Sequence, residues 1–171
     1  ITLELNFLFT CICVQSGLRR ILENRYKHSD SLMTMKLCSA CLLGIKCRYN
    51  GKGKLNKKVI KLMEKEMLIP FCPEQLGGLP TPREPAEQKE NRAITKSGKD
   101  VTKNLERGAK QVLRLAKLFG IEEAILKQRS PSCGCGQIYD GTFSGRVIKG
   151  DGVTTALLKR NGIKVVSEED L

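Results

Sequence analysis

Apolar residues follow two patterns along this chain: short continuous runs, and longer segments in which they recur every three or four residues. Short runs bounded by turn residues are typical of buried strands, and the longer spacing is typical of amphipathic helices. From Met35 onward the two patterns alternate. The predicted strands are 36–40, 68–71, 124–127 and 163–166. The predicted helices are 55–67, a longer one that is capped by Asp100 or Thr102 and whose apolar face ends at Phe119, and 153–160.

This longer predicted helix carries the clearest helical pattern. Its apolar face, with a residue every four or three positions, consists of Leu105, Ala109, Val112, Ala116 and Phe119. The preceding residues 73–91 are rich in glycine and proline, which predicts a long, shaped loop. Between the two, 93–95 and 100–101 predict a small hairpin.

Strands that alternate with helices need crossover connections, and these make neighbouring strands parallel. We therefore expect a small three-layer α/β fold, with a mostly parallel sheet and helices on both faces. A chain of 171 residues has room for one such domain, which we place at 35–171. Residues 1–34 lack the regular pattern. We expect them to be upstream translated sequence or a peripheral extension, and we set Cys11 and Cys13 aside with them.

The formal net charge of +12 is large for this length and favours an anionic partner such as nucleic acid. The cations are nevertheless scattered along the sequence, and the densest run is Lys52, Lys54, Lys57 and Lys58. A nucleic-acid-binding surface is expected to combine a basic stripe with stacking aromatics, and neither is evident from the sequence. We interpret the charge as a solvated surface, so nucleic acid is not the favoured partner.

Eight cysteines indicate either a disulfide framework or metal and redox chemistry in a reduced compartment. The apolar stretch 5–14 has no basic region before it and no small-residue cleavage site after it, and it is too short to span a bilayer. We therefore expect a cytoplasmic protein, in which a ligand role for the cysteines is favoured. The only histidine, His28, precedes the expected domain, so a metal site there would be rich in thiolates.

Cysteines follow three of the predicted strands. Cys41 comes after the first strand, Cys72 after the second, and Cys133 a few residues after the third. Cys47 returns from the first loop, whereas Cys38 lies within the first strand as a small buried residue. Because ligands bind beyond the carboxyl ends of parallel strands, the thiols at these ends are expected to share one site. Spacing alone leaves an iron–sulfur cluster, a zinc ion and inert buried thiols all open.

A series of motifs covers 35–171 and is absent from 1–34. In chain order they are 39–44 (SACLLG), 47–51 (CRYNG), 72–83 (CPEQLGGLPTPR), 98–102 (GKDVT), 126–127 (LK), 130–134 (SPSCG), 138–141 (IYDG) and 152–154 (GVT). In this order the motifs resemble the thiouracil desulfurase family, a bacterial iron–sulfur family long catalogued as a domain of unknown function.

The resemblance implies a [4Fe-4S] cluster held by three cysteines, with the fourth iron free to bind the sulfur of a thiolated nucleobase such as 2-thiouracil. Carried over by motif, the ligands are Cys41, Cys47 and Cys133. Cys72 is the reserve ligand. Cys135 is less typical of the family pattern, and a further thiol there could cap the open iron. The implied activity is a non-redox desulfuration.

The resemblance also implies two catalytic residues near the substrate, Glu74 and Ser130. Glu74 would activate water or shuttle a proton, or else it only caps nearby backbone amides. Ser130 would orient the substrate, or else it only forms a turn. Arg83 and Lys127 would hold an anionic group of the substrate, or else they are plain surface charges.

Two other functions stay open from the sequence. One is a basic module that is stabilised by zinc or by a cluster and binds RNA. The other is a sulfur-transfer protein whose nucleophile is Cys72 or Cys135, since a lowered thiol pKa would make either of them reactive. In the favoured interpretation the partner of the protein is a small thiolated substrate, and the protein is not expected to bind a membrane.

Overall fold

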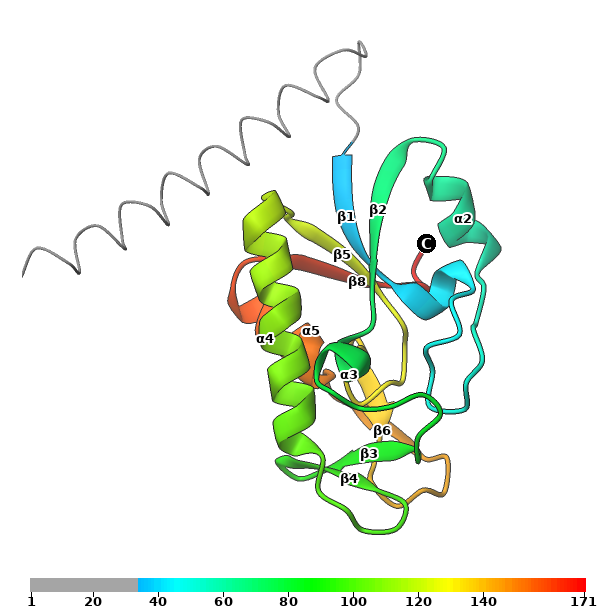
Figure 1. Ribbon diagram of the computed structural model, residues 1–171, viewed down its shortest axis with the longest axis vertical. Coiled ribbons are helices and arrows are strands. Elements are labelled where there is room, and N and C mark those ends of the chain that lie inside the picture. The colour runs from blue at the N-terminus through cyan, green and yellow to red at the C-terminus, as the bar shows by residue number, and fades with distance from the viewer. Residues whose placement is uncertain (1–33) are drawn as a thin grey trace, which may run out of the picture.

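The computed structural model describes residues 34–171, and Figure 1 shows how their elements are arranged. The predicted extension 1–34, except Thr34, lies outside the described residues, and so do Cys11, Cys13 and His28. The strands are β1 (Thr34–Ser39), β2 (Glu66–Phe71), β3 (Ala86–Lys89), β4 (Arg92–Thr95), β5 (Glu123–Leu126), β6 (Gln137–Tyr139), β7 (Val147–Lys149) and β8 (Lys164–Ser167). The helices are the 3-10 turn η1 (Ala40–Leu43), α2 (Lys57–Leu62), α3 (Pro73–Leu76), α4 (Thr102–Phe119) and α5 (Val153–Arg160).

A four-stranded sheet forms the centre of the fold, in the order β2-β1-β5-β8, with every neighbouring pair parallel. Successive residues of a strand face opposite sides of a sheet. Leu37 therefore packs into one core with Val112 of α4 and Leu158 of α5, whereas Cys38 packs into a second core with Val59 of α2. Figure 1 shows α4 and α2 on opposite sides of the sheet. The expected three-layer α/β fold is confirmed.

Helix α4 has the buried face that its apolar spacing predicts. Its N-cap residue is Val101, between the two predicted caps, and the side chain of Asp100 accepts a hydrogen bond from the amide of Thr102 at 2.8 Å. Leu105, Ala109, Val112 and Ala116 are all buried. Helix α5 has its predicted bounds, 153–160. In the described part of the chain, no helix combines the length and the apolar content needed to cross a membrane.

The predicted helix 55–67 is too long. The side chain of Asn56 accepts hydrogen bonds from the amides of Lys58 and Val59, so the helix starts only after Asn56. Of the apolar residues that suggested the longer helix, Val59 is buried, but Leu55 and Met63 are exposed. The residues after Leu62 turn directly into β2, which begins at Glu66, two residues before the predicted strand.

The predicted loop 73–91 is also corrected. It contains α3 and β3, and β3 pairs with β4 as an antiparallel hairpin. The predicted pairing of 93–95 with 100–101 forms on the other side of β4 as a short antiparallel bridge between Ile94 and Asp100. Its hydrogen bonds run from the amide of Val101 to the carbonyl of Ala93 (2.9 Å) and from the amide of Thr95 to the carbonyl of Lys99 (2.8 Å). A further hairpin, β6 with β7, has no counterpart in the prediction. Its strands have only three residues each, too few for a periodic signal.

Helices α3 and α4 pack backbone against backbone. A Cβ atom on Gly108 of α4 would lie 1.8 Å from the carbonyl oxygen of Pro73, and one on Gly77 would lie 2.0 Å from that of Asn104. Asn104 also donates its side-chain amide to the carbonyl of Gly77 at 2.9 Å. Only glycine fits at these two contacts, and they hold α3 at the carboxyl end of β2.

The order of the sheet creates a divergence between β1 and β5. The chain leaves β1 toward β2 on one side, and it leaves β5 toward β8 on the other. Loops that leave neighbouring strands in opposite directions open a crevice at the carboxyl ends of those strands, where ligands of such sheets bind. The loops that follow β1 and β5 carry Cys41 and Cys133.

Candidate functional site

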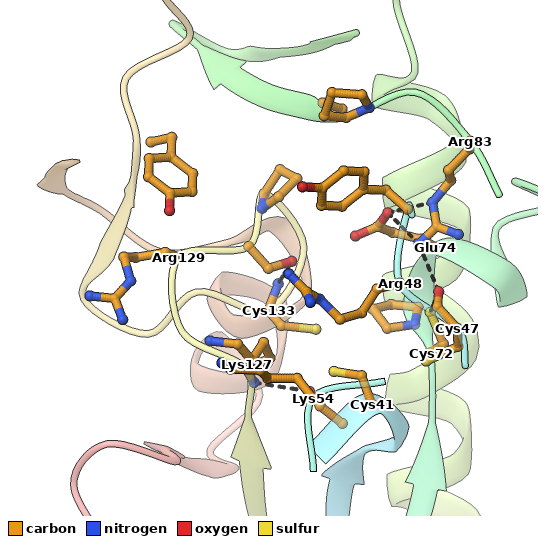
Figure 2. Close-up of a pocket in the computed structure, with 18 of the residues that line it drawn as sticks. Cys41, Cys47, Arg48, Lys54, Cys72, Glu74, Arg83, Lys127, Arg129 and Cys133 are labelled. Carbon is orange, nitrogen blue, oxygen red and sulfur yellow. Dashed lines mark hydrogen bonds and ion pairs between the residues drawn. The ribbon is translucent and has the colours of Figure 1, made fainter. Parts of the chain in front are cut away.

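A cavity of about 510 Å³ lies at the carboxyl ends of the strands. Four cysteines line it, and Figure 2 shows them around one space: Cys41, Cys47, Cys72 and Cys133. Three of them are buried and Cys72 is half-buried, and all four are free thiols. The structure therefore brings together the thiols that follow β1, β2 and β5.

The loop after β1 presents two of these thiols because it folds back on itself. Cys41 lies in η1, directly after the strand, and its carbonyl accepts a hydrogen bond from the amide of Lys54 at 2.8 Å. The amide of Asn56 donates to the carbonyl of Leu42 at 2.9 Å. These bonds close the loop and return Cys47 to the cavity, where it is 1% exposed.

The loop after β5 is fixed around Cys133 by hydroxyl groups. Ser130 Oγ accepts hydrogen bonds from the amides of Ser132 and Cys133, both at 3.1 Å. Thr155 Oγ1 of α5 donates to the carbonyl of Cys133 at 2.9 Å. Gly152 lets the start of α5 approach, since a Cβ atom there would lie 2.4 Å from the carbonyl carbon of Ser132. Ser130 thus forms the turn that orients Cys133.

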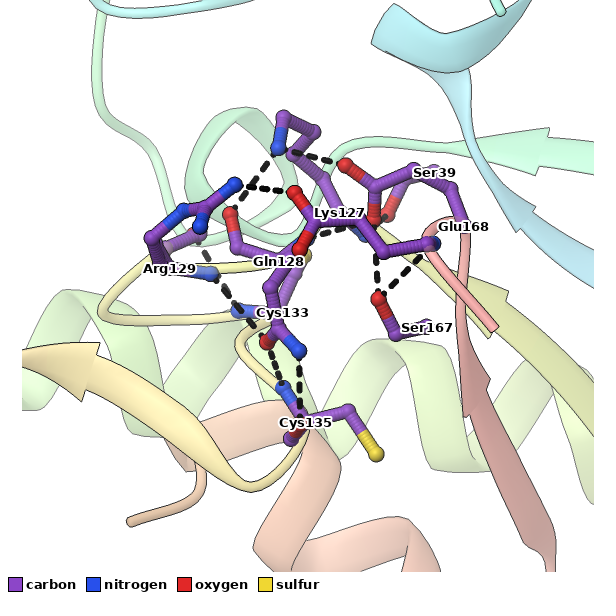
Figure 3. Close-up of polar contacts among 10 residues, drawn as sticks. Ser39, Lys127, Gln128, Arg129, Cys133, Cys135, Ser167 and Glu168 are labelled. Atoms are coloured by element: carbon purple, nitrogen blue, oxygen red, sulfur yellow. Dashed lines mark hydrogen bonds and ion pairs between the residues drawn. The ribbon is translucent and has the colours of Figure 1, made fainter. Parts of the chain in front are cut away.

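A second set of polar contacts holds the same loop from the C-terminal end of the chain (Figure 3). Glu168 accepts hydrogen bonds from the amide of Gln128 at 2.7 Å and from Lys127 Nζ. The side-chain amide of Gln128 bonds both the N–H (2.8 Å) and the carbonyl (2.9 Å) of Cys135. Ser39 Oγ of β1 accepts a hydrogen bond from the amide of Lys127 at 3.0 Å, which joins the two loops.

The thiols of the cavity influence one another. The hydrogen bond with Cys41 raises the pKa of Cys47 to about 11, although Cys72 acts in the opposite direction. Contact with Cys47 and burial raise the pKa of Cys72. Burial raises the pKa of Cys133, while hydrogen bonds from the hydroxyls of Ser39 and Ser130 lower it by less. A thiol with a raised pKa ionises readily only beside a cation, and a bound metal provides that positive charge.

The donor set of the cavity indicates which metal groups it suits. Four thiols line the cavity, and no histidine of the described part of the chain is among its lining residues. Among the described residues, no group of three histidine, cysteine, aspartate or glutamate side chains is arranged as a single-ion site. A cluster of four irons is wider than one ion and is bound by thiolates alone, so the donor set fits a cluster.

Glu74 stands at the cavity wall in α3 and is held by Arg83 (Figure 2). Arg83 Nε and Nη2 both lie 2.7 Å from Glu74 Oε2, and Arg83 Nη2 also donates to the carbonyl of Cys47 at 3.0 Å. Both contacts of the carboxylate use Oε2, which leaves Oε1 for the cavity. The Arg83 side chain is only 7% exposed, so it is not a plain surface charge. It ties the carboxylate to the loop that carries Cys47.

Other candidates from the sequence have different positions. Lys127 lines the cavity, but its ammonium group is paired with Glu168. Cys135 is not among the residues that line the cavity, and its thiol donates to the carbonyl of Val165 at 3.5 Å. The suggestion that Cys135 could cap an open iron therefore has no support from its position. Cys38 is fully buried inside β1, as expected.

The prediction missed the aromatic wall of the cavity. Tyr49, Tyr139 and Phe143 line it together with the thiols. Glu87 of β3 holds this wall, since its carboxylate accepts hydrogen bonds from the amides of Gly141 (3.0 Å) and Phe143 (2.9 Å). Tyr49 and Tyr139 lie within motifs of the sequence, but Tyr49 is in the loop after η1 and Tyr139 is in β6, so the two come together only in the fold.

Comparisons with known proteins agree with this site. The family model of the 2-thiouracil desulfurases matches residues 37–170. Over 147 residues the chain is 47% identical to the uncharacterized protein YbbK of Bacillus subtilis (strain 168), which covers 80% of this chain and 97% of YbbK. Among solved structures, the [4Fe-4S]-dependent thiouracil desulfidase TudS is similar, with a TM-score of 0.77 and 47% identity over 81% of this chain and 93% of TudS. The chain belongs to the 2-thiouracil desulfurase family.

Proposed function

We propose that this protein is an iron–sulfur enzyme that removes the sulfur of a small thiolated nucleobase such as 2-thiouracil without a change of redox state. The observation that carries the proposal is the cavity itself, in which four free thiols lie beside a carboxylate held by an arginine. The family and the [4Fe-4S]-dependent relative support the same activity.

The ligands that we propose for the [4Fe-4S] cluster are Cys41, Cys47 and Cys133, with Cys72 as the reserve ligand. An iron with an open position supplies a soft Lewis acid for the sulfur of a C=S group, which otherwise leaves poorly. Hydroxyl groups of Ser39 and Ser130 act on Cys133 and tune this ligand, since hydrogen bonds to the sulfurs influence a cluster.

Glu74 is the proposed acid–base residue. The overall reaction adds one water to the C=S carbon and releases hydrogen sulfide, so two protons end on the leaving sulfur and no electrons are exchanged. Glu74 takes a proton from the attacking water on Oε1 and returns it to the leaving sulfur. Arg83 fixes the carboxylate through two charge-assisted contacts to Oε2. The aromatic wall of Tyr49, Tyr139 and Phe143 provides apolar surface for a planar ring.

For Ser130 we propose a role in orienting the substrate in addition to its turn. Its Oγ accepts two amide hydrogen bonds, and its one proton bonds the Cys133 sulfur, so Ser130 donates to the substrate only when this proton turns from Cys133 to a substrate atom. A sulfur-transfer role for Cys72 is less favoured, because the family and the [4Fe-4S]-dependent relative support a cluster-dependent desulfuration.

We also propose that 35–171 is the single desulfurase domain and that 1–34 is an extension outside it, in agreement with the family match over 37–170. The location that we propose is the cytoplasm. All six cysteines of the described residues are free, which is typical of a reducing compartment.

Turnover of 2-thiouracil by the anaerobically reconstituted enzyme tests the proposed function. Glu74→Gln is expected to lower kcat about 100-fold or more while the cluster content stays that of wild type. Glu84→Gln is the matched control, because Glu84 is an exposed carboxylate next to Arg83 that does not line the cavity. Unchanged turnover in Glu74→Gln would contradict the role of the carboxylate, and no turnover in wild type with a full cluster would contradict the substrate class.

A further inference from the structure

Five basic residues line the outer face of α4, opposite the face that packs on the sheet. All five are exposed and recur every four or three positions: Lys103, Arg107, Lys110, Arg114 and Lys117. At 100° and 1.5 Å per residue they fall within an arc of about 80° and extend over about 21 Å. We call these five residues the α4 stripe. Figure 1 shows α4 along the outer side of the molecule.

The charge of the α4 stripe is only partly compensated. None of the five cations forms an ion pair with an acidic residue of the described part of the chain. Glu106, the one acidic residue within α4, lies at the edge of the arc, four positions before Lys110, and Asp100 interacts with Lys103 electrostatically. Like charges three or four positions apart on a helix repel. The stripe therefore keeps an excess of positive charge, which a bound anion would offset.

The chemistry of the stripe selects among anionic partners. A membrane-surface helix inserts an exposed apolar face, and the apolar face of α4 is buried in the core. Protein interfaces are enriched in aromatic residues and depleted in lysine, and the stripe holds three lysines and no aromatic residue. A row of cations without apolar or aromatic members fits a row of phosphates, which lysine and arginine contact without reading bases.

We propose that the α4 stripe binds nucleic acid through its phosphate backbone, without sequence preference. None of its residues lines the cysteine cavity, so this site is separate from the proposed chemistry and does not depend on it. Along the linear sequence these cations are separated by other residues, so the sequence alone does not favour nucleic acid as a partner. The helix gathers five of them because their spacing matches its turns.

Fluorescence anisotropy of the full chain with a labelled RNA duplex of about 20 base pairs tests this inference. Five phosphate contacts predict that affinity falls about 500-fold between about 50 and 200 mM salt. A variant with all five stripe residues changed to Gln should bind at least about 100-fold more weakly at the lower salt and lose most of the salt dependence. The double variant Lys110→Gln with Arg114→Gln should reduce the slope of log affinity against log salt by about two.

The control neutralises five exposed lysines on other elements and carries the same net charge of +7, five below the +12 of wild type. The changed residues are Lys52, Lys57, Lys61, Lys65 and Lys149. This control should keep nearly wild-type affinity. Equal loss in both five-residue variants, with wild-type circular dichroism, would overturn the inference, because net charge alone would then explain binding. Tighter binding of wild type to polyglutamate or to anionic vesicles than to the duplex would overturn it in favour of a protein or a membrane.

Discussion

Replacing Gly108 by Ala is expected to destabilise this protein, although the same change inside an ordinary helix stabilises it by about 1 kcal/mol. The added Cβ would lie 1.8 Å from the carbonyl oxygen of Pro73. A normal contact needs more than about 3 Å, so α3 must move by more than about 1 Å. This movement strains the bond from Asn104 to Gly77 and the pair of Glu74 with Arg83.

The magnitude follows from these opposing terms. Overpacking costs about 1–3 kcal/mol, and the weakened hydrogen bond from Asn104 to Gly77 adds about 1 kcal/mol. After the gain in helix propensity is subtracted, the free energy of unfolding is expected to fall by about 1–3 kcal/mol. Because α3 also carries Glu74, a shift of this size should lower kcat by about 100-fold in the enzyme with a full cluster.

Urea unfolding followed by circular dichroism measures the first effect, and steady-state turnover of 2-thiouracil measures the second. Gln111→Ala, at an exposed position of the same helix, is the matched control and should change stability by no more than about 0.5 kcal/mol. If Gly108→Ala is as stable as wild type or more stable, the close packing of α3 on α4 does not have the energetic role assigned to it.

Two further predictions concern ion pairs at opposite ends of the sheet. Arg83→Met should lower kcat by about 100-fold with the cluster retained, because Glu74 loses the partner that fixes it; turnover and iron content measured on one sample check this. Hydrogen bonds with Lys164 and Lys36 lower the pKa of Glu123 from 4.5 to about 2, so its stabilisation is complete above pH 4.5 and is lost as the pH falls toward 2. Since a third of this side chain is exposed, solvent screens its ion pairs. We therefore expect Glu123→Gln to lower the free energy of unfolding, measured in urea, by about 1 kcal/mol at pH 6 and not to change it near pH 2. An equal loss at both pH values would contradict the assignment.

The parts of the fold that the sequence predicts well are those with a repeating local signal. The buried face of α4 follows from the spacing of Leu105, Val112 and their neighbours, and the shared position of Cys41, Cys72 and Cys133 follows from the direction of parallel strands. The helix follows from the period of its apolar residues, and the cysteine site follows from the rule that the carboxyl ends of parallel strands meet at one edge of the sheet.

The remaining features depend on contacts between distant or irregular segments. The length of α2 is set by one capping side chain, that of Asn56, which the apolar spacing of Leu55 and Met63 conceals. The clamp of Glu168 on Gln128 joins residues forty positions apart, and no pattern in either segment indicates it. The α4 stripe is different, since its spacing is visible once the helix is assigned.

The central claim is that three particular cysteines hold a [4Fe-4S] cluster, and iron and acid-labile sulfide analysis of anaerobically reconstituted variants tests it most directly. We expect four irons and four sulfides per chain in wild type. We expect the cluster to be lost in Cys41→Ser, Cys47→Ser and Cys133→Ser. It should be retained in Cys72→Ser and in Cys135→Ser, the control whose thiol lies outside the cavity. Loss of the cluster in Cys72→Ser with retention in Cys47→Ser, or a wild-type protein that binds only zinc, would contradict the claim.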